Sequence, residues 1–165
     1  MNSRKKELGT IALPTGRAFV TDPGYPPDAQ HAHTLSVLPG NYNCKVTILE
    51  SRRHGARPFV LEAVHESRKL PYYSEDAPFK VFVDSGQASI IEEESYRKLH
   101  ASEKSEDAFY RKLWPLTSIT GKKGGAGLLG RYGVACASGF GDGAYRCILA
   151  RNKNRDIVAI KVVFT

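Results

Sequence analysis

The sequence has no long apolar run, and this absence limits where the chain can reside. No stretch of about 18 apolar residues occurs in it, so we expect no transmembrane helix and no membrane partner. Residues 1–6 are basic, but polar residues follow them, so the apolar segment of a secretory signal is missing. We therefore expect a cytoplasmic protein in which residues 1–8 form a flexible basic tail.

Cysteine is scarce. The chain holds three cysteines, Cys44, Cys136 and Cys147, and none of them belongs to a C-x-x-C pair. An odd count without a secretory signal is typical of a reduced, cytosolic chain. Each cysteine falls within an alternating apolar pattern, which predicts a small core residue rather than a nucleophile.

Motifs for catalysis and cofactor binding are also lacking. Residues 125–130 match G-x-G-x-x-G, but no βαβ unit surrounds them and the chain from Arg131 onward is strand-like, so we expect no dinucleotide site. We interpret 121–130 as a mobile basic loop. No G-x-S-x-G elbow occurs. His31 and His33 offer two ligands where a metal site needs three or four. The sequence therefore predicts no cofactor, no metal site and no catalytic residue.

Positive charge is what the sequence has in excess. The net charge is +7, and residues 121–165 hold eight Lys/Arg against two Asp. A basic face favours an acidic partner, which is an acidic protein or, alternatively, nucleic acid or a phosphorylated ligand. We expect cations from separate loops to converge into one docking patch. The candidate partner-binding residues are Arg52, Arg53, Lys122, Lys123, Arg131, Arg151, Lys153 and Arg155.

Short strands dominate the predicted fold. Alternation of apolar and polar residues predicts a hairpin from the segments 44–49 and 59–64. Residues 157–164 are apolar on both faces and predict a central strand.

Helical signals occur between residues 89 and 114. Ser89 and Glu92 have capping-box spacing, which predicts a helix through residue 99. Residues 105–113 predict a second short helix that Pro115 ends. The order of strands, one or two helices and strands predicts a single α+β, β-rich domain over 1–165, built as an antiparallel sheet or a β-sandwich.

Two carboxylates lie beside glycines at predicted strand ends. Asp142–Gly143 is a strong hairpin signal between strands at 132–138 and 145–150. Asp84 follows a predicted strand at 80–83. A carboxylate at such a place either caps its turn or meets a ligand, and we interpret both as turn caps.

Six short motifs, taken in order, resemble a known pattern. They are Gly9-Thr10-Ile11, Pro14-Thr15-Gly16-Arg17, Asp22-Pro23, Leu38-Pro39-Gly40-Asn41-Tyr42, Val83-Asp84-Ser85-Gly86 and Gly141-Asp142-Gly143-Ala144-Tyr145. Over nearly its whole length the chain resembles the bacterial domain of unknown function 4241 family. It departs from that pattern between residues 103 and 130, and it carries Ser85 where the family has Ala. The resemblance implies a β-rich cytoplasmic bacterial domain of a kind often associated with toxin neutralisation.

The leading hypothesis is a non-catalytic binding protein, namely an immunity protein that sequesters a cognate toxin domain through a basic surface. One alternative is a small-molecule binder or hydrolase, in which an arginine holds an anion and a carboxylate acts as base or as metal ligand. Its pocket would gather Arg17, Asp22, Asp84, Asp142 and Tyr145. Another alternative is a nucleic-acid-binding protein, whose affinity would fall steeply with added salt.

Overall fold

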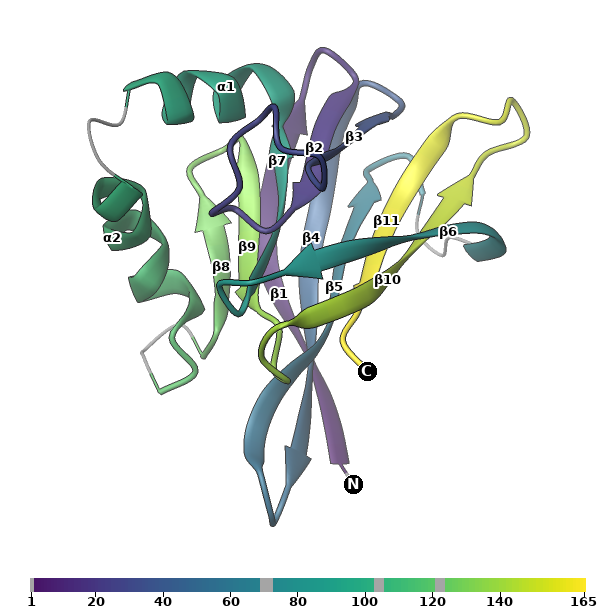
Figure 1. Ribbon diagram of the computed structural model, residues 1–165. Coiled ribbons are helices and arrows are strands. Elements are labelled where there is room, and N and C mark those ends of the chain that lie inside the picture. Colours follow the sequence, from purple (N-terminus) through teal and green to yellow (C-terminus); the bar gives the residue numbers. More distant parts are fainter. Residues whose placement is uncertain (1, 69–72, 103–105, 121–123) are drawn as a thin grey trace.

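Two antiparallel sheets and two helices form the part of the chain that the structure, a computed structural model, describes: residues 2–68, 73–102, 106–120 and 124–165 (Figure 1). Sheet A has the strand order β1 (Asn2–Leu13), β4 (Gly40–Ser51), β5 (Gly55–His65), β11 (Ile157–Val163), β10 (Gly143–Arg151) and β6 (Tyr73–Val83). Sheet B has the order β3 (His33–Ser36), β2 (Arg17–Thr21), β7 (Gln87–Glu92), β9 (Gly133–Ala137) and β8 (Ala126–Leu129). The helices are α1 (Glu93–Ser102) and α2 (Glu106–Thr117).

The two sheets pack face to face around one apolar core. Alternate residues of β4 from Tyr42 to Ile48 are buried in it, and sheet B contributes Val20 and Ile90 to the same cluster. Burial of alternate side chains is what a strand with one face on a core requires. The structure therefore confirms the α+β, β-rich class and has the form of a β-sandwich.

The helices cover the other face of sheet B (Figure 1). Phe19 and Ile91 point away from the core between the sheets and pack with Tyr96 of α1 and Leu113 of α2. Neither of these two helices is long and apolar enough to cross a membrane, as judged over the described residues. The result is three layers: sheet A, sheet B and the helices.

Two predictions about sheet A are confirmed, and one about the Asp142–Gly143 turn is wrong. The strands β4 and β5 form the expected hairpin, and β11 lies between β5 and β10 in the middle of the sheet. However, β9 pairs with β7 and β8 in sheet B, whereas β10 pairs with β11 and β6 in sheet A. The connection through Asp142–Gly143 therefore carries the chain from one sheet to the other instead of closing a hairpin.

The expected flexible tail is also wrong for the residues that the structure describes. Residues 2–8 form the first half of β1, where Asn2 pairs with Glu50 and Lys5 with Thr47 of β4. Their polar side chains show no apolar alternation, so the sequence carries no strand signal there. They form a strand because the edge of β4 offers them backbone hydrogen-bond partners.

The first helix begins later than predicted, at Glu93, because Ser89 lies within β7 and its hydroxyl donates to the Thr21 carbonyl. Glu92 caps the helix with its own side chain. Its carboxylate accepts the backbone N–H groups of Glu94 (3.0 Å) and Ser95 (2.8 Å), as well as the Ser95 hydroxyl (2.6 Å). The capping residue is thus the acid itself rather than the serine three positions before it.

The second helix runs through Pro115 to Thr117 instead of ending before the proline. Pro115 lies in the last turn, where the missing N–H removes one helical hydrogen bond at most. The Thr117 hydroxyl donates to the Leu113 carbonyl (3.0 Å) and helps to hold this turn.

We expect Glu92→Gln to lower the free energy of unfolding at pH 7 by about 1–2 kcal/mol, because one capping acceptor is lost. Burial alone would raise the pKa of Glu92, but hydrogen bonds from Ser95, the Glu94 backbone and Thr15 outweigh it and lower the pKa. The stabilisation is therefore present above the ordinary carboxyl pKa of about 4.5 and is lost as the pH falls through the lowered value.

Urea unfolding of both proteins between pH 3 and pH 7 measures this difference. The free energies of unfolding of the wild type and of Glu92→Gln should converge at the acid end of this pH range. Glu94→Gln is the matched control, since Glu94 is exposed and its carboxylate pairs along the helix with Lys98. A Glu92→Gln deficit that persists unchanged at pH 3 would contradict the assigned role of the carboxylate.

Candidate functional site

Asp22 follows β2, is 1% exposed and accepts four hydrogen bonds through its carboxylate. One carboxylate oxygen accepts the backbone N–H groups of Asp84 (2.8 Å) and Ser85 (2.7 Å). The other accepts the Gly24 N–H (2.7 Å) and the Ser85 hydroxyl (2.7 Å). Four donors occupy the lone pairs of the carboxylate, so Asp22 braces the turn between β6 and β7 and has no free acceptor for a ligand.

Two further carboxylates lie near Asp22, together with a tyrosine that the sequence reasoning did not single out. The Tyr25 hydroxyl donates to Asp84 (2.5 Å), so Asp84 does not cap its own turn. Asp142 is exposed and directly precedes Gly143, which pairs with Val83 beside Asp84. Burial, the hydrogen bond to Asp84 and the charges of all three acids raise the pKa of Tyr25. Its phenol therefore stays protonated and acts as a donor.

The remaining two residues of the expected pocket do not join these acids. Arg17 begins β2, pairs with Glu93 (2.5 Å) and donates to the Ser36 hydroxyl (3.2 Å). The length of β2 separates it from Asp22 by about 16 Å. Tyr145 is buried against Phe164, and its hydroxyl donates to the Gly141 carbonyl (2.8 Å). The structure brings together the three acids but does not gather all five residues into one pocket.

The predicted basic residues lie at opposite ends of sheet A rather than in one patch. Arg52 and Arg53 occupy the turn between β4 and β5, at the bottom of Figure 1. Arg151 ends β10, and Lys153 and Arg155 lie in the turn before β11, near the other end of β5. The ten residue steps of β5 between these ends correspond to about 33 Å. The expected convergence into one contiguous patch is therefore wrong.

Two of the predicted residues, Lys122 and Lys123, lie outside the described residues. The segment that contains them was interpreted as a loop from 121 to 130. Within it, Ala126–Leu129 is strand β8, which pairs with β9 and contributes buried residues to the core. Sequence reasoning missed this short strand because the start of the segment is rich in glycine and charged residues.

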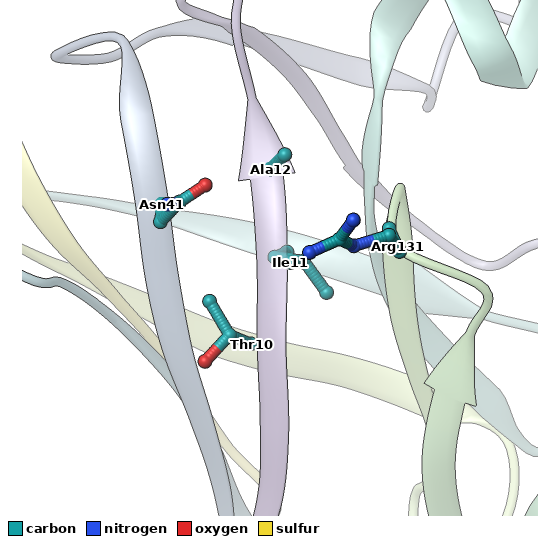
Figure 2. Close-up of a pocket in the computed structure, with 5 residues that line it drawn as sticks. All are labelled: Thr10, Ile11, Ala12, Asn41 and Arg131. Carbon is teal, nitrogen blue, oxygen red and sulfur yellow. The ribbon is translucent and has the colours of Figure 1, made fainter.

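Arg131 borders a shallow pocket between the turn from β8 to β9 and the strands β1 and β4. The pocket has a volume of about 300 Å³ and is lined by Thr10, Ile11, Ala12, Asn41 and Arg131. Figure 2 shows the Arg131 side chain extending toward β1. The Arg131 carbonyl accepts the Ala12 N–H (2.7 Å), which fixes the turn against the sheet edge. The polar side chains of its lining are those of Thr10, Asn41 and Arg131.

A positively charged arm extends from the end of sheet A that carries Arg52 and Arg53. The basic arm, as we call it, comprises residues 2–8 of β1 and residues 46–57 of β4, β5 and their turn (Figure 1). It holds six Lys/Arg against two Glu. Its cations are Arg4, Lys5, Lys6, Arg52, Arg53 and Arg57. Sequence reasoning missed the first three because it assigned them to a tail.

The cysteines are buried in the core, and the two histidines of the His31–His33 pair pack on aromatic side chains. Cys44, Cys136 and Cys147 are buried in the core between the sheets, as predicted, and burial raises the pKa of all three thiols, that of Cys44 to about 12. His31 packs on Phe82, whereas His33 packs on Phe79. In the described part of the chain, no group of three or more His, Cys, Asp or Glu is arranged to hold a metal ion.

Comparison of the chain with protein-family models, with curated proteins and with solved structures gives no match. The resemblance to the domain of unknown function 4241 family therefore stays a prediction.

Proposed function

We propose that the protein is a non-catalytic binding protein that recognises an acidic protein partner through the basic arm. In its most concrete form, it is a cytoplasmic bacterial immunity protein that neutralises a cognate toxin. The observation that carries this proposal is the concentration of six Lys/Arg against two Glu on one projecting, backbone-paired element. A rigid element with one sign of charge steers an oppositely charged partner and raises its association rate.

The pairing of charges within the arm supports this role. Arg4 is held by Glu50 (2.8 Å), so one of the two glutamates is already neutralised by a neighbour. Arg52 and Arg53 lie exposed at the tip. Arg57 lies at the base, where its guanidinium donates to the carbonyls of His54 (2.9 Å) and Gly139 (3.1 Å). Such a series of fixed and free cations suits a partner surface that carries several carboxylates.

Two of the acids that a catalytic function would need have structural tasks. Asp22 accepts four hydrogen bonds, and Asp84 accepts the Tyr25 phenol. The cysteine thiols are buried and their pKa values are raised, which disfavours the reactive thiolate. These observations favour recognition by a surface over chemistry in a pocket.

Co-expression with candidate toxin domains taken from the products of neighbouring genes tests the proposal. Growth rescue and a stable complex are expected for the wild type. Arg52→Glu/Arg53→Glu should weaken the complex at least tenfold and abolish rescue. Lys153→Glu/Arg155→Glu is the matched control, because it makes the same charge change at the opposite end of sheet A and should leave both unchanged.

Two results would overturn the proposal. One is the absence of both rescue and complex for the wild type. The other is binding of a duplex oligonucleotide whose affinity falls steeply with salt and depends on Arg52 and Arg53, since counterion release is the signature of phosphate contacts.

A further inference from the structure

The loop between β9 and β10 holds a large apolar side chain out in solvent. Phe140 is 51% exposed, although most aromatic side chains of a domain this size lie in its core. It sits between Gly139 and Gly141, whose φ angles of 73° and 85° are in the left-handed region. The backbone there turns so that Phe140 occupies the tip of the connection between the two sheets.

Hydrogen bonds on both sides of Phe140 fix this position. The Gly139 carbonyl accepts Arg57 of the basic arm (3.1 Å), and the Gly141 carbonyl accepts the hydroxyls of Ser138 (2.5 Å) and Tyr145 (2.8 Å). The Ser138 N–H also donates to Gly86 (2.8 Å). The flanking carbonyls are held by Arg57 of β5, by Tyr145 of β10 and by Ser138 of the loop itself, so the backbone on both sides of Phe140 is fixed. Its exposure is imposed by the scaffold.

A second exposed apolar side chain lies close to the residues around Phe140. Ile119, which follows α2, is 42% exposed. A Cβ atom on Gly125 would lie 3.5 Å from Ile119 and 3.1 Å from Pro58, and one on Gly139 would meet the Pro58 carbonyl. Pro58 therefore joins the surroundings of Ile119 to those of Phe140 at the base of the basic arm. Ile119 and Phe140 are thus two exposed apolar residues whose neighbouring glycines, Gly125 and Gly139, both approach Pro58.

The charges around Phe140 differ on its two sides. On one side lies the basic arm with Arg57 at its base and Arg52 and Arg53 at its tip. On the other side lie Asp142, two residues from Phe140, and Asp84 beside it. A nucleobase stacked on Phe140 would bring its phosphates close to these two carboxylates, which disfavours nucleic acid. A protein surface with acids toward the arm satisfies the cations and leaves the two aspartates at the rim.

We infer that Phe140 is the apolar anchor of the partner interface and enters an apolar pocket on an acidic protein. The inference rests on the proposed function, because the basic arm supplies the charge that attracts the partner. Binding energy at interfaces concentrates in a few rigid, buried aromatic or arginine side chains surrounded by less important contacts. Phe140 is a rigidly held aromatic side chain, and Arg57 lies beside it. Both kinds of anchor residue are therefore in place before a partner binds.

Selection from a phage-displayed library of random 12-residue peptides tests this assignment without knowledge of the partner. Selected peptides should combine Asp or Glu with a large apolar residue. Their affinity for Phe140→Ser should fall at least tenfold. Trp114→Ser is the matched control, since Trp114 is 66% exposed on α2 yet lies outside this loop, and it should bind like the wild type. Thermal unfolding should be the same for all three proteins.

Three outcomes would overturn the inference: no enriched peptides, enriched peptides that bind Phe140→Ser as tightly as the wild type, or Phe140-dependent binding of a 12-nucleotide oligothymidylate in place of peptides. The proposed function fails separately, if the wild type gives neither toxin rescue nor a stable complex. If toxin rescue succeeds while Phe140→Ser changes nothing, the basic arm binds the partner and Phe140 is not the anchor.

Discussion

Replacement of Asp22 by asparagine is expected to lower the free energy of unfolding by about 3–5 kcal/mol. The Asp22 carboxylate is buried and accepts hydrogen bonds from Gly24, Asp84 and, twice, Ser85. An asparagine of nearly the same shape has one oxygen, so its amide group faces two of these donors and cannot accept from them. Two charge-assisted bonds are lost, and two buried donors are left without acceptors. Urea unfolding at pH 7 measures the loss.

Asp142→Asn is the control for this substitution. Asp142 belongs to the same group of acids but is exposed, so its replacement should change stability by less than about 0.5 kcal/mol. If Asp22→Asn were as mild as the control, the turn between β6 and β7 would not depend on the carboxylate.

Alanine at Gly139 is the second substitution with a large expected effect. Gly139 has a φ of 73°, and a Cβ atom there would lie 2.0 Å from the Pro58 carbonyl oxygen. The left-handed backbone costs about 1–2 kcal/mol for a residue with a side chain, and overpacking adds about 1–3 kcal/mol. We expect a total loss of about 3 kcal/mol, together with displacement of the loop that carries Phe140.

Gly141→Ala separates the two contributions. Gly141 has a similar φ of 85°, but its added Cβ would meet nothing within 4 Å. Gly141→Ala should therefore lower the free energy of unfolding only by the cost of the left-handed backbone conformation, about 1–2 kcal/mol. Urea unfolding measures both variants, and amide NMR spectra show whether Arg57 and Gly86 shift in Gly139→Ala. Equal costs for the two alanines would contradict the close approach of Gly139 to Pro58.

The alternation of apolar and polar residues identified several strands, but it did not identify the strands with which they pair. The alternation in 44–49 and 59–64 located a hairpin, and the apolar residues from 157 onward located a central strand, because burial on one or both faces leaves a mark in the sequence. Asp142–Gly143 correctly marks a bend. Whether the strands beside a bend pair with one another depends on long-range packing, and the two glycines before Asp142 direct the chain to the other sheet.

The positions of the cations were less predictable than the core strands, because they also depend on which strands pair. Arg52 and Lys153 both lie in turns, and the sequence cannot tell that these turns close opposite ends of the same sheet. The polar residues of β1 have no strand pattern, so their cations were assigned to a tail. Their place on the basic arm follows from pairing with β4, a tertiary interaction that local composition does not encode.

The position of β11 has a consequence for synthesis of the chain. This last strand lies between β5 and β10, so sheet A consists of two unconnected halves until residues 157–163 have left the ribosome. During translation, β5 and β10 each present an unpaired apolar border that a chaperone would have to shield. Loss of these few residues would divide the sheet rather than shorten it.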